Sequence, residues 1–104
     1  MENYEIPLIN KEVIDYKGTR RVCVAPMLDW TDRHFRYMAR QITENAWLYS
    51  EMINAGAIIY GDKDRFLMFN EGEQPVALQL GGSEPNLLAQ AARKAAEYGY
   101  DEIN

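Results

Sequence analysis

The chain has 104 residues, of which 47% are apolar and 26% charged, a composition typical of a globular protein. It contains no apolar stretch near the ~18 residues that cross a bilayer, and residues 1–10 lack the basic and apolar regions of a signal peptide, so we expect a cytoplasmic protein without membrane contact. The net charge of −5 argues against this segment alone forming a nucleic-acid surface, and the single cysteine excludes an internal disulfide.

The first predicted strand covers about residues 21–25 and ends in a turn. Its apolar run is continuous rather than alternating, which is typical of a parallel strand covered on both faces. Cys23 lies in the middle of this run and is expected to be buried as a small apolar side chain. Pro26 cannot donate to a sheet ladder and therefore ends the strand. Residues 1–19 carry no usable motif and are predicted to be an N-terminal extension, with residues 20–104 forming one domain portion.

A helix is expected to begin at Thr31 or Asp32 and to end near residue 45, with Asp29 or Thr31 as its N-cap. One apolar stripe is predicted along it, made of Phe35, Met38, Ala39 and Ile42. Basic residues on and before this helix favour a solvated face, with a local contribution to RNA binding as the alternative; they are Arg20, Arg21, Arg33, Arg36 and Arg40. The sole histidine, His34, has no partner at ligand spacing and is expected to be a surface or packing residue.

A second strand is predicted over about residues 47–50, and Glu51 and Met52 are expected to follow it. A helical stretch should then cover residues 54–60. The segment 62–70 alternates polar and aromatic residues, which predicts an irregular connection with a short helix around residues 66–68.

The third strand is predicted over residues 76–80, where Gly81 and Gly82 let the chain turn. Ser83 is expected to cap the next helix, over about residues 85–98, which has proline in its first turn and an apolar face of small residues. Gly99 should stop it, and residues 100–104 should begin a fourth strand. This alternation of strands and helices predicts a parallel α/β fold.

The run from Val22 to Arg36, with Leu78-Gln79-Leu80-Gly81-Gly82 and Asp101-Glu102-Ile103-Asn104, resembles the N-terminal part of the tRNA-dihydrouridine synthases. The motif Leu-Asp-Trp-Thr-Asp-Arg-His at residues 28–34 resembles that of the A subfamily in particular. The resemblance implies the N-terminal part of a (β/α)₈ TIM barrel. Such a barrel needs roughly 200 residues, so this chain would supply about three and a half βα units and be incomplete.

The resemblance also implies that Pro26, Met27 and Leu28 lie against the ring of FMN. By residue chemistry alone, this segment would be a strand-ending turn whose Met27 plugs the barrel mouth. Gln79 is a carboxamide inside an apolar strand, where burial is costly unless its donor and its acceptor both find partners. A core or an outward-facing glutamine would fit equally well, whereas the resemblance implies a hydrogen bond to the flavin.

The activity implied by the resemblance is reduction of D-loop uridines in tRNA to 5,6-dihydrouridine. NADPH would reduce FMN, a hydride would pass to the base, and a cysteine would protonate the adjacent carbon. That cysteine belongs to a Gly-Cys-Pro motif beyond the position that Asn104 matches, so no catalytic residue is expected in this chain, which should be inactive alone. Cys23 is not that cysteine, and Asn104 is left out of the site. The family counterparts of Glu51 and Met52 lie close to the active site, but no chemical role follows for Glu51, and a capping or ion-pair role is equally supported.

Two alternatives remain from the sequence. The chain could be part of another FMN barrel reductase, such as a dihydroorotate or dihydropyrimidine dehydrogenase, or a non-catalytic half-barrel that acts as an interaction module. No catalytic triad, metal-ligand spacing, P-loop or dinucleotide fingerprint is present, so no metal is expected. The full-length protein would bind tRNA mainly through a helical C-terminal domain.

Overall fold

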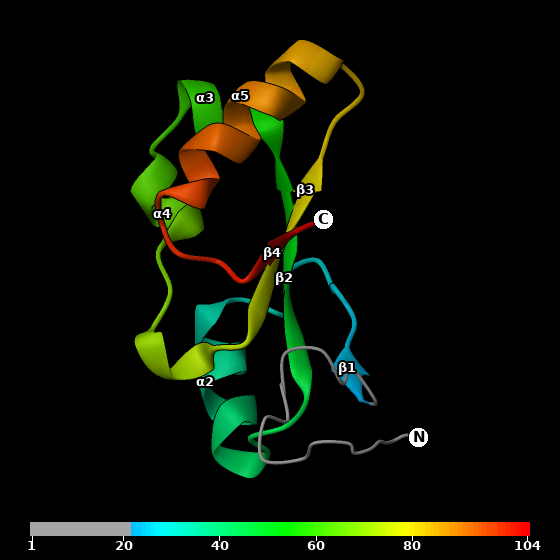
Figure 1. The fold of residues 1–104 in the computed structure, drawn as a ribbon, viewed down its shortest axis with the longest axis vertical. Coiled ribbons are helices and arrows are strands. Elements are labelled where there is room, and N and C mark those ends of the chain that lie inside the picture. Colours follow the sequence, from blue (N-terminus) through cyan, green and yellow to red (C-terminus); the bar gives the residue numbers. More distant parts are fainter. Residues whose placement is uncertain (1–21) are drawn as a thin grey trace, which may run out of the picture.

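The computed structural model describes residues 22–104, and the predicted N-terminal extension of residues 1–19 lies outside them, as do Arg20 and Arg21. Strands and helices alternate along the described chain (Figure 1), which confirms the predicted α/β class. In chain order the elements are β1 (Cys23–Val24), α2 (Arg33–Ile42), β2 (Trp47–Asn54), α3 (Ala55–Tyr60), α4 (Lys63–Leu67), the 3₁₀ helix η2 (Glu71–Glu73), β3 (Val76–Gly81), α5 (Pro85–Ala96) and β4 (Glu102–Ile103).

The strands form one parallel sheet in the order β1-β2-β3-β4. Strands that follow one another in sequence are neighbours in the sheet, as they are in a (β/α)₈ barrel. Helices α2, α3, α4 and α5 lie on the same side of β2 and β3 in Figure 1. Because all strands run the same way, their carboxyl ends and the loops that follow them lie at one edge of the sheet, where barrel enzymes place their sites.

The hydrophobic core fills the space between the sheet and the helices. Its larger cluster joins Ile53 and Leu78 of the sheet to Ile58, Leu67, Ala91 and Ala95 of α3, α4 and α5. A smaller cluster under α2 contains Ala39, Leu48 and Val76. The small side chains Ala91 and Ala95 are fully buried, so α5 lies close to the sheet as its alanine-rich face predicts.

β1 is shorter and more exposed than predicted. Among the described residues it covers only Cys23–Val24, and Cys23 is exposed, so the prediction of a buried thiol is wrong. Val24 packs against the cluster under α2, whereas Val22 is 65% exposed. Cys23 is exposed and Val24 is half-buried, so the predicted coverage of both faces of this strand is not found.

Helix α2 begins and ends inside the predicted range. Its N-cap is Asp32, whose side chain accepts a hydrogen bond from the Phe35 amide at 2.9 Å, rather than Asp29 or Thr31. The cap lies after Asp29 and Thr31 because residues 27–31 form a turn that is closed by its own hydrogen bonds. The helix ends at Ile42, three residues before the predicted end.

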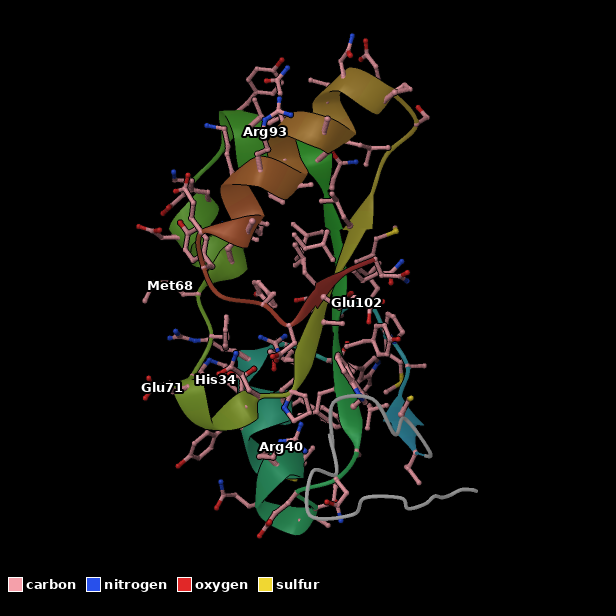
Figure 2. The ribbon with its side chains drawn as sticks, viewed as in Figure 1. His34, Arg40, Met68, Glu71, Arg93 and Glu102 are labelled. Atoms are coloured by element: carbon pink, nitrogen blue, oxygen red, sulfur yellow. The ribbon has the colours of Figure 1, made fainter. Side chains whose placement is uncertain are left out.

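The predicted apolar stripe of α2 is wrong at two of its four positions. Met38 is 47% exposed and Ile42 is 77% exposed. Arg36 and Arg40 are buried instead, at 4% and 8% exposure, so the prediction of a solvated basic face is also wrong for them. Arg40 lies between α2 and the segment that leads into β3 (Figure 2), where it donates to the carbonyls of Glu73 and Pro75.

The connection between β2 and β3 is more ordered than predicted. Helix α3 matches its predicted range, and the side chain of Asn54 caps it by accepting from the Gly56 amide at 2.8 Å. Helix α4 covers Lys63–Leu67, so the short helix expected around residues 66–68 begins earlier. The helical turn η2 then leads to β3.

Helix α5 starts at Pro85 as predicted, but its N-cap is Glu84, with no capping bond from the side chain, rather than Ser83. Its regular part ends at Ala96, and the turn continues to Gly99, whose φ of 93° favours glycine. β4 covers Glu102–Ile103, inside the predicted range. In the part of the chain that the structure describes, no helix combines the length and the apolar composition needed to span a membrane.

Candidate functional site

The loop that follows β1 is closed by Thr31. The Met27 amide donates to Thr31 Oγ1 at 2.9 Å, and Thr31 Oγ1 donates to the Met27 carbonyl at 3.2 Å. The amides of Trp30 and Thr31 also donate to that carbonyl, both at 2.9 Å. Thr31 is fully buried, while Pro26, Met27 and Leu28 are exposed around it. The predicted flavin-contacting segment is therefore a turn of fixed shape at the carboxyl edge of the sheet.

Strand β2 is longer than predicted and irregular where it supports this loop. It continues to Asn54, so Glu51 and Met52 lie within the strand rather than after it. Its pairing with β3 shifts register between Tyr49 and Met52. Such an irregularity bends a strand and redirects its side chains, and it is frequent beside active sites.

Glu51 lies in this irregular segment and holds the loop after β1 in place. Its Oε1 accepts from the Asp29 amide at 2.8 Å, and its own amide donates to the Thr31 carbonyl at 3.1 Å. Asp29 has a φ of 68°, a left-handed conformation in which aspartate is one of the more common non-glycine residues. The role of Glu51, left open by the sequence, is thus to fix the loop after β1.

Gln79 lies on the sheet face opposite the helices. Its neighbours Leu78 and Leu80 pack toward the helices, and side chains alternate along a strand. The Gln79 amide donates to Ser50 Oγ at 2.9 Å, and Gln79 Oε1 accepts from Asn104 Nδ2 at 2.8 Å. Within residues 22–104, Nε2 of Gln79 has no hydrogen-bond partner. The side chain therefore has two N–H groups to offer a ligand.

Two residues lie beside Gln79: Asn104, which the sequence analysis left out of the site, and Met52, whose family counterpart is expected close to the active site. Asn104 orients its carboxamide, as described above. Met52 is opposite Gln79 in the register of β2 and β3 and is 52% exposed. A Cβ atom added at Gly81 would lie 2.7 Å from Met52 Sδ, so glycine leaves room for Met52 at this edge. The alternation along β3 and β4 is the signal that could have pointed to Asn104.

No described contact joins Met27 to Gln79, but β2 supports both. Glu51 holds the loop that contains Met27, and its neighbour Ser50 accepts the Gln79 amide. Ser50 Oγ in turn donates to the Glu51 carbonyl at 2.7 Å. The irregular segment of β2 thus connects the two predicted parts of the site and sets their relative positions.

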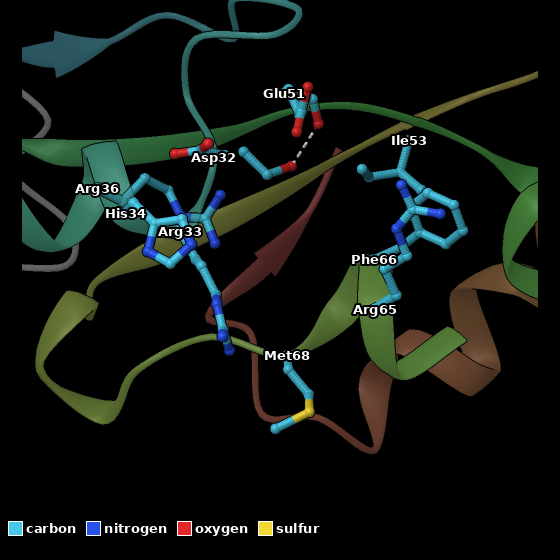
Figure 3. Close-up of a pocket in the computed structure, with 10 residues that line it drawn as sticks. Asp32, Arg33, His34, Arg36, Glu51, Ile53, Arg65, Phe66 and Met68 are labelled. Atoms are coloured by element: carbon cyan, nitrogen blue, oxygen red, sulfur yellow. Dashed lines mark hydrogen bonds between the residues drawn. The ribbon is translucent and has the colours of Figure 1, made fainter. Parts of the chain in front are cut away.

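A polar pocket of about 420 Å³ lies between α2, β2 and α4 (Figure 3). Arg33, His34 and Arg36 line one side of it, and Arg65, Phe66 and Met68 line the other. Ile53 is part of the core on the helix side of the sheet and also lines this pocket. Ser50 and Glu51 line it as well, so the pocket adjoins the segment of β2 that supports the Met27 loop and the Gln79 amide, while Gln79 itself does not line it.

The sequence of this chain matches known proteins along most of its length. The sequence model of the dihydrouridine synthase family (Dus) matches residues 23–104. The chain belongs to this family. A tRNA-dihydrouridine(20/20a) synthase from Xylella fastidiosa is 57% identical over 99 residues, which cover 95% of this chain and 29% of the relative. Proteins of the same name from Vibrio vulnificus and Synechocystis are 62% and 60% identical over 81% and 78% of this chain, and over 26% and 24% of their own lengths.

The chain thus spans less than a third of the curated relatives that it matches. The four parallel strands of residues 22–104, in sequential order, correspond to the N-terminal part of the TIM barrel of the dihydrouridine synthase family. The matched segment contains the whole loop after β1, the irregular part of β2, Gln79 and Asn104.

His34 and Cys23 lie apart from the site so defined. His34 is exposed at the rim of the helix-side pocket. Cys23 pairs in register with Trp47 at the amino end of β2, whereas Gln79 pairs with Met52 toward its carboxyl end. Among residues 22–104, no three side chains of the His, Cys, Asp and Glu types are grouped so that they could hold a metal ion.

Proposed function

We propose that this chain is part of the catalytic domain of an enzyme that reduces uridine to 5,6-dihydrouridine in tRNA, with FMN as cofactor and NADPH as reductant. The observation that carries the proposal is the 57% identity over 99 residues to a tRNA-dihydrouridine(20/20a) synthase. The relatives' names specify positions 20 and 20a, and we assign the same target uridines to the protein that contains this segment.

The residues at the carboxyl edge of the sheet fit a flavin. Met27 and Met52 present exposed, polarisable side chains suited to the flat apolar face of the ring. Nε2 of Gln79 offers donors for the carbonyl oxygens or ring nitrogens at the polar edge. FMN, when bound here, would supply the hydride chemistry, and the protein would supply orientation and hydrogen bonds.

Pro26, Met27 and Leu28 would lie against one face of the ring. The hydrogen bonds of Thr31 and Glu51 already hold their loop in place without a ligand. Gln79 would fix the rotation of the ring in its plane, with Asn104 holding the carboxamide oxygen so that Nε2 stays directed at the flavin. A ready-made arrangement of this kind binds tightly because little conformational freedom is lost on binding.

The general acid would come from outside residues 22–104. Cys23 is the only cysteine in the chain and lies toward the amino end of the sheet, away from the carboxyl edge where the base would meet the flavin. A uridine in folded tRNA must also be swung out of its stack to reach that edge. The 104 residues alone are therefore expected to be inactive.

Binding of tRNA would depend largely on other parts of the protein. The net charge of −5 on this chain disfavours phosphate contacts, which need clustered Lys and Arg side chains. The enzyme would work in the cytoplasm, where its tRNA substrate is found.

The test is a chimaera in which this chain replaces the matching segment of the Xylella fastidiosa relative, hereafter called the chimaera. We expect the purified chimaera to carry FMN and, with NADPH, to form dihydrouridine at positions 20 and 20a of unmodified tRNA. Because the rest of the relative supplies the acid and the tRNA-binding surface, this experiment tests only whether these 104 residues perform their part.

The intact relative serves as the positive control, and the 104-residue chain alone as the negative control. A folded chimaera that binds no flavin and forms no dihydrouridine would contradict the proposed function and favour a non-catalytic module. Flavin binding with reduction of a free pyrimidine, but not of tRNA, would favour a small-molecule reductase.

A further inference from the structure

A buried ion pair joins α2 to the segment before β3. Arg36 Nε donates to Glu73 Oε1 at 2.5 Å, with side-chain exposures of 5% and 0%. The other carboxylate oxygen of Glu73 accepts from the amide and the side chain of Asn70, at 2.7 and 3.1 Å. Both oxygens of the Glu73 carboxylate thus accept hydrogen bonds, and the carboxylate held by Asn70 fixes the position of Arg36.

The same guanidinium reaches the loop after β1. Arg36 Nη1 donates to the Thr31 carbonyl at 2.8 Å, an oxygen that also accepts from the Glu51 amide. Thr31 closes the turn around Met27 through its hydroxyl, as described above. Three hydrogen-bonded steps, from Glu73 to Arg36, from Arg36 to Thr31 and from Thr31 to Met27, therefore connect Glu73 to Met27.

We propose that Arg36, held by Glu73, is a positioning residue that fixes the Met27 loop in the position in which it contacts the flavin. The inference deepens the proposed function and rests on it. The planar guanidinium presents its N–H groups in a rigid fork, so the bond of Nε to Glu73 also fixes the direction in which Nη1 points. A lysine would keep the charge but could not make both contacts in one defined geometry.

Neighbouring Arg40 provides the matched comparison. It lies one helical turn further along α2, is also buried, and also contacts Glu73. Its hydrogen bonds go to the carbonyls of Glu73, Pro75 and Thr43 and do not reach the loop after β1. Arg36 and Arg40 thus share burial, helix and charge, and they differ in contact with Thr31.

The inference is tested with Arg36→Lys and Arg40→Lys in the chimaera. The first readout is hydrogen exchange of the Met27, Asp29 and Thr31 amides without flavin. We expect Arg36→Lys to speed exchange by about tenfold, since one hydrogen bond that holds the loop is lost, and Arg40→Lys to leave it within about twofold. The second readout is FMN affinity, which should fall about tenfold in Arg36→Lys only, with a shifted visible absorption spectrum of the bound flavin.

Unchanged exchange in Arg36→Lys, or equal acceleration in both variants, would overturn the positioning role. The two proposals fail in different ways. If the unmodified chimaera binds no FMN while Arg36→Lys alone frees the loop amides, the proposed function is wrong and the control of the loop by Arg36 stands. If FMN binds the unmodified chimaera and both variants with equal affinity, the flavin role of Arg36 is wrong and the proposed function stands.

Discussion

Glu73→Gln is expected to destabilise the chimaera by about 3–5 kcal/mol, the usual effect of removing one partner from a buried ion pair. The carboxylate is fully buried and accepts from Arg36 and Asn70 at once. Glutamine has the same shape, but it removes the charge that compensates Arg36 and turns one acceptor oxygen into an N–H₂ donor that faces other donors. Equilibrium urea unfolding measures the loss.

Glu71→Gln is the matched control, because Glu71 lies in the same 3₁₀ helix and points away from the molecule (Figure 2). We expect it to change the unfolding free energy by no more than about 0.5 kcal/mol. A double variant, Glu73→Gln with Arg36→Met, should recover part of the loss because no buried charge is then left alone. Equal effects of Glu73→Gln and Glu71→Gln would show that the pair contributes nothing.

Gln79→Leu is expected to weaken FMN binding to the chimaera by roughly one to two orders of magnitude. Leucine keeps the volume and leaves the backbone bond to Ser50 in place, but it removes the donors offered by Nε2. An unpaired polar group on the bound flavin would then cost about 1–3 kcal/mol, and each 1.4 kcal/mol corresponds to about tenfold in affinity. Flavin fluorescence titration measures the change.

Two controls separate this effect from general damage. Gln74→Leu makes the same chemical change just before β3, where the side chain bonds the Gly99 carbonyl instead of facing the site. Cys23→Ala alters the only cysteine, which is exposed in the described chain. Both should leave flavin affinity within about twofold, and Cys23→Ala should leave turnover nearly intact. Loss of turnover in flavin-loaded Cys23→Ala, with none in Gln79→Leu, would place the active site elsewhere.

The sequence predicted the elements whose signals are local. Proline at the start of α5, glycine after it and the apolar residues 76–78 that begin β3 each depend on the preferences of a few adjacent residues. Helix α3 was also predicted, although Asn54, expected as its first residue, is its N-cap. For these elements the order and type of structure were confirmed, and differences are confined to their ends.

The errors arise where contacts between distant segments outweigh local pattern. An arginine on a helix is normally solvated, so nothing in the sequence around Arg36 indicates that Glu73 will bury it. Met38 and Ile42 were wrongly expected to be buried for the same reason. With Arg36 and Arg40 facing the interior, α2 turns these two apolar residues outward. The sequence also left the role of Glu51 open, because that role depends on an irregularity in β2 and on a loop 22 residues earlier in the chain.

The central claim is that the flavin binds at the carboxyl edge of the sheet, on the face that carries Gln79. A crystal structure of the chimaera with FMN tests it most directly. The account predicts the flavin ring against Met27, with Nε2 of Gln79 within hydrogen-bonding distance of the polar edge of the ring. A flavin bound instead between α2 and α4, in the pocket lined by Arg33 and Arg65, would contradict it.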